Sequence, residues 1–230
     1  MNRQSAIALL SGGLDSTVSM VVSIKNYDIK LALFFDYGQR SIKKETMAIE
    51  NICKHYKIPY KIIKLDWLKE ITHTSLVNQE QSLPEYTMEN LNSNVSTLKN
   101  SAKAVWVPNR NGVMLNIAAA IAETINCNTI IFGANIEEAT TFPDNSNDFA
   151  EKLTEVFSYS TSNGVKVEVP LVNKDKTEIV SLAIKNNIPL NLIWSCYSGG
   201  DKHCGKCESC ARLKRALVNN NKLELWQEII

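Results

Sequence analysis

The stretch "ALLSGGLDSTVSM", Ala8 to Met20, decides the fold of this 230-residue chain. A short apolar run leads into two glycines, and a segment with helical spacing follows directly. Gly12 and Gly13 allow backbone conformations that other residues avoid, and the N–H groups that open the next helix point toward any anion held at such a turn. A Walker-type loop ends in Gly-Lys-Ser or Gly-Lys-Thr, and this turn has no lysine. The pattern predicts a phosphate-binding turn of another kind.

The polar residues of the turn agree with that prediction. Ser11 and Ser16 add hydroxyl donors on either side of the glycines. Two glycines followed by Asp15 are also typical of an ordinary turn in which the acid caps a helix. The rest of the chain is needed to decide between the two interpretations.

Alternating strands and helices predict the architecture. Five runs read as strands, namely Ala6–Leu10, Lys30–Phe35, Tyr60–Leu65, Asn128–Asn135 and Val165–Leu171. Helix-like segments separate them, which predicts a Rossmann-like, doubly wound α/β fold with a mainly parallel five-stranded sheet. We place a nucleotide-binding domain at residues 1–190 and a small segment on the same core at 191–230. The polar stretch from Ile71 to Lys103 is expected to form a long loop beside the site.

The overall composition restricts the partners. A net charge of +1 offers no basic surface for nucleic acid. No apolar run approaches the roughly 20 residues of a membrane span, and the first residues lack the apolar region of a signal peptide. We therefore expect a cytoplasmic protein with no nucleic-acid and no membrane partner.

Four of the six cysteines lie in one C-terminal segment. Cys204, Cys207 and Cys210 form a double C-x-x-C pattern, and Cys196 precedes them by eight positions. In a reducing compartment this clustering favours a metal over disulfides, and four thiolates close a tetrahedral shell around Zn²⁺. We predict a structural zinc ion. His203 is the alternative as one ligand, or else an outer-shell group.

Three further segments carry a resemblance to a known family. They are "FDYGQR" (Phe35–Arg40), "VPNRN" (Val107–Asn111) and "WSCYSGGDKHCGKCESC" (Trp194–Cys210). With "SGGLDS", they resemble the QueC family of 7-cyano-7-deazaguanine synthases. That family is similar to the N-type ATP pyrophosphatases of the HUP, or adenine nucleotide α-hydrolase, group. The resemblance spans nearly the whole chain and makes the glycine turn a cradle for leaving pyrophosphate.

The family's activity defines the leading functional hypothesis. It implies an ATP-dependent carbon–nitrogen ligase that adenylates 7-carboxy-7-deazaguanine, adds ammonia and proceeds to the nitrile, releasing AMP and pyrophosphate. ATP, Mg²⁺ and Zn²⁺ are the implied cofactors, and a homodimer is expected from the relatives. One alternative is a diverged enzyme that joins the adenylated acid to another amine, such as a protein amine in a bacterial defence system. The other is a zinc-stabilised nucleotide-binding module without catalysis.

The resemblance also implies where the nucleotide binds. The implied contacts are Ser11, Gly12, Gly13, Leu14, Asp15, Ser16, Phe35, Gln39 and Arg40. The carboxylate of Asp15 would help to coordinate Mg²⁺ with the phosphates, which makes this residue catalytic.

Two cations complete the predicted catalytic set. Arg110 follows Pro108 at a turn that opens a helix, so it is a candidate to face the phosphates or the substrate carboxylate. Lys176 stands where another helix begins, and the resemblance gives it a phosphate contact, with Lys174 as a weaker competitor. The alternative interpretation makes both cations ordinary solvated residues at helix ends.

The segment expected to bind the deazaguanine acid departs from the family pattern. Relatives carry "E-T-D-Y/F-S-G-Y-P-D-C", and the matching run here is "IEEATTFPDN", Ile136 to Asn145. Glu138 replaces an aspartate, Phe142 keeps the aromatic position and Asp144 is retained. The resemblance makes these three residues and Arg110 the contacts to the deazaguanine acid, with a pocket of altered volume.

Overall fold

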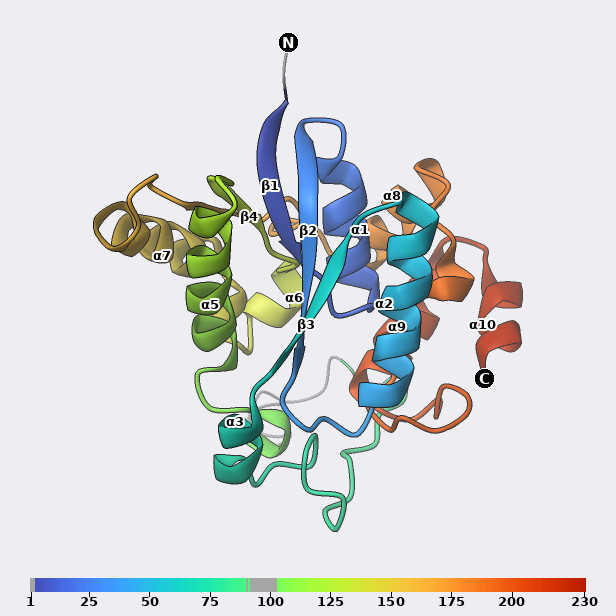
Figure 1. Cartoon of the computed structure of the whole chain (residues 1–230). Helices are drawn as coiled ribbons and strands as arrows, with labels where there is room; N and C mark the ends of the chain where they lie inside the picture. Colours follow the sequence, from blue (N-terminus) through green and yellow to red (C-terminus); the bar gives the residue numbers. More distant parts are fainter. Residues whose placement is uncertain (1–2, 90, 92–102) are drawn as a thin grey trace.

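The computed structural model describes residues 3–89, 91 and 103–230 (Figure 1). Within them, five strands form one sheet in the order β3-β2-β1-β4-β5, and every pairing is parallel. The strands are β1 (Gln4–Leu9), β2 (Tyr27–Asp36), β3 (Tyr60–Lys64), β4 (Thr129–Ile131) and β5 (Lys166–Glu168). The predicted Rossmann-like parallel sheet is confirmed.

Helices cover both faces of the sheet (Figure 1). One face packs against α1 (Leu14–Ser23), α2 (Ile42–Tyr56), α8 (Lys176–Lys185), α9 (Glu208–Asn219) and α10 (Leu223–Ile229). The other packs against α3 (Asp66–Ile71), α5 (Arg110–Thr124) and α7 (Asn147–Ser160). Further short elements are α6 (Ile136–Ala139), η2 (Pro143–Asn145) and η3 (Leu190–Leu192).

The apolar run of β1 is continuous because both of its faces are buried. Ala6 and Ala8 point into the core beneath α1 and α2, whereas Ile7 and Leu9 point into the core beneath α5. Successive side chains of a strand point to opposite faces, so a strand between two helical layers needs apolar residues at every position. The continuous apolar run of β1 therefore agrees with its position at the centre of the sheet.

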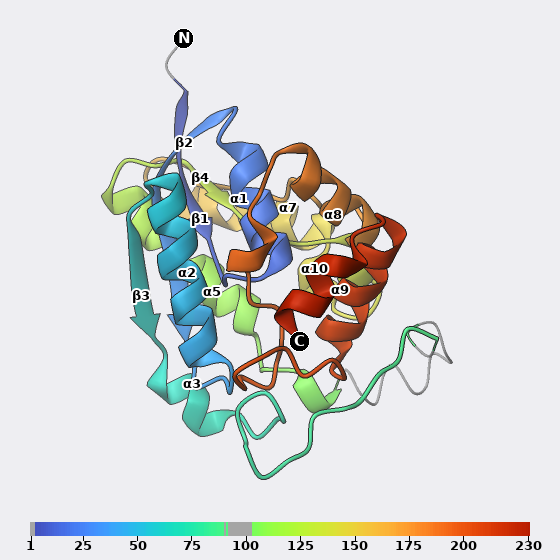
Figure 2. The ribbon, with the colours of Figure 1, turned by 90° about the vertical axis from the view of Figure 1, so that its right-hand side faces the viewer.

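The C-terminal segment shares the core on the α1 side of the sheet. Cys196, Cys207, Cys210, Leu213 and Trp226 belong to the same buried cluster as the residues of α1 and α2. Figure 2 shows α8, α9 and α10 together on this side. The described residues of this segment therefore pack into the same core as α1 and α2.

The expected Ile71–Lys103 loop is only partly irregular, because Ile71 ends α3 and both Leu91 and Lys103 are helical. Residues 72–89 contain turns and bends but no helix or strand, while residues 90 and 92–102 of the predicted Ile71–Lys103 loop lie outside the described residues. In the described chain, no helix combines the length and the apolar character that a membrane crossing requires.

Candidate active site

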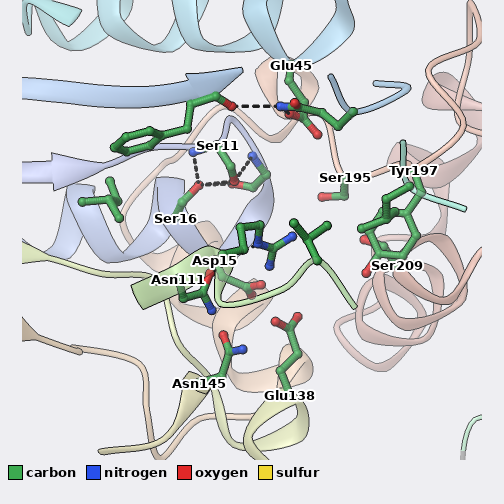
Figure 3. A pocket seen from close by; sticks show the side chains of 18 of the residues that line it. Ser11, Asp15, Ser16, Glu45, Asn111, Glu138, Asn145, Ser195, Tyr197 and Ser209 are labelled. Atoms are coloured by element: carbon green, nitrogen blue, oxygen red, sulfur yellow. Dashed lines mark hydrogen bonds between the residues drawn. The ribbon is translucent and has the colours of Figure 1, made fainter. Parts of the chain in front are cut away.

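A cavity of about 240 Å³ opens at the carboxyl ends of the strands, compared with about 10 Å³ for the next cavity (Figure 3). It lies at the ends of the neighbouring strands β1 and β4. After β1 the chain crosses to one face of the sheet, and after β4 it crosses to the other. Doubly wound folds bind their ligands at such a switch point. Its walls come from the glycine turn, the end of β2, the first turns of α5, α6 and α8, and the C-terminal segment.

The glycine turn is shaped by two close approaches. Gly12 has φ +77°, and a Cβ atom there would meet the Ala48 Cβ at 3.0 Å and the Glu45 carbonyl oxygen at 3.2 Å. A Cβ atom on Gly133, just after β4, would lie 2.8 Å from the backbone nitrogen of Ser16. Both positions need glycine because backbone passes too near for a side chain.

The two predicted serines hold this turn together. The Ser11 N–H donates to Ser16 Oγ at 3.1 Å, and the two hydroxyl oxygens lie 3.0 Å apart (Figure 3). Asp15 does not occupy the N-cap position of α1, because Gly13 does, and no side chain of the cap residue bonds there. The capping interpretation of Asp15 is therefore wrong.

The C-terminal segment contributes a serine that sequence reasoning missed. The Trp194 N–H donates to the Gly12 carbonyl at 2.8 Å, and this brings Ser195 beside the start of α1. Ser195 Oγ accepts the Leu14 N–H at 3.3 Å. Because helix N-terminal N–H groups bind anions, this hydroxyl occupies one donor of the anion site. Ser195 lies within the Trp194–Cys210 motif, which was the sequence signal that could have found it.

Lys176 joins two carboxylates across the cavity. Its ammonium forms ion pairs with Asp15 Oδ2 and, at 2.7 Å, with Glu138 Oε1. The side chains of Lys176 and Asp15 are 8% and 16% exposed, so this ion pair is largely shielded from water. The helix α8 that carries it begins with a capping box formed by Asp175 and Glu178. Three predicted site residues thus meet, although Lys176 and Asp15 are 161 positions apart.

The pKa values of these three groups move in different directions. Burial raises the pKa of Asp15, against the opposing effect of the Lys176 ammonium. Burial also opposes ionisation of Glu138, but attraction to Lys176 outweighs it and lowers the pKa of Glu138. For Lys176 burial favours the neutral amine, yet the two carboxylates dominate and raise its pKa. Lys176 is therefore charged at neutral pH.

Arg110 is positioned differently from the other cations of the cavity. Its Nη1 donates to the Tyr37 hydroxyl at 3.2 Å, and the guanidinium lies 5.7 Å from the centre of that ring. Lys176 and Arg212 are paired with carboxylates, whereas Arg110 has no salt bridge to any described residue. Burial acts to lower its pKa, but Tyr37 and Asp144 outweigh it and the pKa is raised. Arg110 is a charged donor left for an anionic ligand.

Two residues predicted to contact the deazaguanine acid, Phe142 and Asp144, lie on the same side of the cavity as Arg110. Phe142 and Asp144 line the cavity, and the Phe142 ring stacks on Trp106 with centroids 5.8 Å apart. Burial raises the pKa of Asp144, and the Arg110 guanidinium opposes that shift. Trp106 stands one residue before the "VPNRN" motif and was not predicted as a site residue.

Two of the predicted nucleotide contacts are turned to other partners. Arg40 donates to the carbonyl oxygens of Asn78 and Gln81 and does not line the cavity. Gln39 does line it, but its amide donates to the Phe35 carbonyl at 3.0 Å and to Glu45 at 2.8 Å. Gln39 therefore braces the loop after β2.

A charge network behind the cavity was also missed. The carboxylate of Glu137 pairs with Arg212 and, at 2.5 and 2.6 Å, with Arg215, while it accepts the Lys176 backbone N–H at 2.9 Å. Glu208 joins this network through Arg212 at 2.7 Å. The i,i+4 spacing of Glu208 and Arg212 was a sequence signal for that pair. One carboxylate thus links α6, α8 and α9.

The four predicted cysteines form one group whose sulfur atoms all lie within 4.8 Å of one another. A tetrahedral thiolate shell with metal–sulfur bonds of 2.3 Å has sulfur atoms roughly 3.8 Å apart. The Cys204 and Cys210 sulfurs are 3.9 Å apart, and backbone N–H groups donate to the sulfurs of Cys196 and Cys204. These cysteines can hold a single metal ion.

His203 lies beside this group without belonging to it. Its Nε2 accepts the Ser195 N–H at 3.2 Å, and its ring packs against Trp194 with centroids 4.4 Å apart. Of the two interpretations of His203, the structure favours the outer-shell group. It is linked to the start of α1 through Ser195, whose hydroxyl accepts the Leu14 N–H.

The fold and the site define a class of protein. A parallel sheet with a lysine-free glycine loop at its switch point, facing a buried cation, is typical of doubly wound α/β proteins that bind phosphate-containing ligands. The sequence model described as "Queuosine biosynthesis protein QueC" matches residues 5–221. The chain belongs to the QueC family.

Two curated relatives of this chain share a name. A "7-cyano-7-deazaguanine synthase" of Methanosarcina mazei is 52% identical over 93% of this chain and 94% of its own length. Another of that name, from Carboxydothermus hydrogenoformans, is 48% identical over 94% of this chain and its whole length. A solved structure titled a U34-tRNA thiolase NcsA from Methanococcus maripaludis matches 99% of this chain and 73% of its own, at 15% identity and a TM-score of 0.48.

Proposed function

We propose that the chain is an ATP-dependent carbon–nitrogen ligase that converts 7-carboxy-7-deazaguanine and ammonia to 7-cyano-7-deazaguanine. The substrate carboxylate attacks the α-phosphorus of ATP, the bond to the β-phosphate oxygen breaks, and pyrophosphate leaves. Ammonia then attacks the acyl carbon and AMP departs with the electron pair of the broken C–O bond. The amide oxygen then attacks the α-phosphorus of a second ATP and pyrophosphate leaves. Loss of AMP, with the electron pair of the C–O bond, and of both protons on the amide nitrogen gives the nitrile.

One observation carries the proposal: the lysine-free loop, Lys176 and Arg110 share a cavity. The loop N–H groups and Lys176 are placed to bind the leaving pyrophosphate, whose charge increases as the bond breaks. Arg110 is the cation without a carboxylate partner among the described residues, so we assign it the substrate carboxylate or the α-phosphate. Phe35 and Leu14, which also line the cavity, would contact the nucleotide.

The residues present fit a magnesium ion. Asp15 Oδ1 is buried with no hydrogen-bond partner among the described residues, and a carboxylate oxygen is a ligand that Mg²⁺ accepts beside phosphates. When bound, the ion would neutralise phosphate charge. The cysteine group fits Zn²⁺ in a closed shell, so we assign that ion the structural task of holding the C-terminal segment against the loop. A homodimer stays a prediction.

The test is product analysis by mass spectrometry after incubation with ATP, 7-carboxy-7-deazaguanine and ¹⁵N-ammonium. We expect AMP, pyrophosphate and the nitrile carrying ¹⁵N, and we expect Arg110→Met to lose product formation. ADP as the main nucleotide product would contradict the proposal. AMP without amide or nitrile would point to another acceptor amine, and no nucleotide turnover with this acid would support a binding module.

A further inference from the structure

Glu208 is a carboxylate of the cavity that the proposed chemistry leaves without a task. It lies in the first turn of α9, between Cys207 and Cys210, and it lines the cavity together with Ser209. Its side chain is 13% exposed. Figure 3 shows Ser209 beside Tyr197, on the side of the cavity formed by the C-terminal segment.

The hydrogen bonds of Glu208 leave one oxygen available. Oε1 accepts both bonds from Arg212, from Nε at 3.0 Å and from Nη2 at 2.7 Å, whereas Oε2 accepts none from the described residues. Arg212 is fixed in turn by its ion pair with Glu137. An oriented carboxylate with a free oxygen and a cation behind it is a hydrogen-bond acceptor prepared for a ligand donor.

The carboxylates near the loop have other partners. Asp15 and Glu138 flank the Lys176 ammonium, which places them where pyrophosphate would leave. Glu45 accepts from Ser41 at 2.6 Å through one oxygen and from Gln39 through the other.

Asp144 is the remaining carboxylate of the cavity wall. It lies close enough to Arg110 for each to shift the pKa of the other. A ligand whose own carboxylate binds Arg110 brings that charge toward Asp144, so a donor edge at the opposite end of the ligand needs another acceptor.

We propose that Glu208, with Ser209 beside it, accepts hydrogen bonds from the N–H donors at one edge of the substrate's fused ring. The inference rests on the proposed function and names how the same site recognises its acid. The substrate has a carboxylate at one end of its fused ring and adjacent N1–H and 2-amino donors at the other. Glu208 Oε2 accepts from that pair, while Glu138 serves Lys176 instead of the base. Because Cys207 and Cys210 flank Glu208 in the sequence, a metal ion bound by these cysteines would fix the position of the Glu208 carboxylate.

The experiment measures binding by calorimetry, with the zinc-loaded protein and a non-hydrolysable ATP analogue present. The two acids are 7-carboxy-7-deazaguanine and the analogue without the 2-amino group. Glu208→Gln keeps the shape but replaces an acceptor by a donor. We expect it to weaken binding of the deazaguanine acid by about ten- to a hundredfold, as expected for loss of a charged acceptor. Glu224→Gln, an exposed acid of the same segment, is the matched control and should bind as wild type does.

The analogue without the 2-amino group distinguishes loss of a specific hydrogen bond from a general structural effect of Glu208→Gln. Wild type should prefer the deazaguanine acid by about tenfold over the analogue without the amine, and Glu208→Gln should bind both equally. Zinc content and ATP-analogue affinity should match wild type. Equal affinity of wild type and Glu208→Gln for the deazaguanine acid would overturn the inference alone. Failure of wild type to bind that acid, with the ATP analogue bound, would overturn the proposed function as well.

Discussion

Replacing Lys176 by methionine removes the ammonium between two carboxylates and should strongly destabilise the fold. The side chains of Lys176, Asp15 and Glu138 are 8%, 16% and 29% exposed, so water replaces little of the lost attraction. Removing one partner of a buried pair costs about 3–5 kcal/mol, and the partial exposure of Glu138 favours the lower end. We expect the free energy of unfolding at pH 7.5 to fall by about 3 kcal/mol.

Urea denaturation followed by circular dichroism measures this loss. With a slope of about 3 kcal/mol per M, the midpoint should move down by about 1 M. Lys174→Met is the matched control, because Lys174 is 40% exposed and pairs only with exposed Glu178. Its effect should stay within about 0.5 kcal/mol.

The pH dependence distinguishes charge from lost packing. In wild type the lowered pKa of Glu138 gives stability that is present above its unfolded pKa and is lost as the pH falls through the folded one. Without Lys176 the two buried carboxylates should instead have raised pKa values, so their penalty is full at neutral pH and is relieved on acidification. The difference between wild type and Lys176→Met should therefore shrink between pH 7.5 and pH 5. A constant difference, or one no larger than that of Lys174→Met, would refute this reasoning.

Three further predictions concern the metal, the loop and the charge network. Elemental analysis should find one zinc ion per chain, lost in Cys207→Ser, and stoichiometric iron instead would contradict the assignment. Gly133→Ala should lower turnover by about a hundredfold, because its Cβ would lie 2.8 Å from the Ser16 nitrogen, while Gly200→Ala, with its nearest atom at 3.7 Å, should not. Glu137→Gln should cost about 2 kcal/mol in urea unfolding, since it weakens charged hydrogen bonds to two arginines; an unchanged midpoint would contradict the role of that network.

The sequence alone determined the sheet, the glycine turn and the cluster of four cysteines. Each depends on neighbouring residues: apolar runs of strand length, two glycines before a helix, and cysteines spaced by two residues. These patterns restrict local backbone conformation or place ligands within one short segment, so they can be read without knowing which elements meet. The same is true of the helix start at Lys176, which the structure confirms.

Only the tertiary structure decided which charges meet. Arg40 ends the motif after β2, as a site residue would, yet its guanidinium turns to loop carbonyls at Asn78 and Gln81. Lys176 reaches Asp15 across 161 positions because parallel strands bring their carboxyl ends to one edge. The link from Glu208 through Arg212 to Glu137 exists because α9 packs beside α6 and α8. No local pattern encodes these partners, since the energy of a buried charge depends on what the rest of the fold places against it.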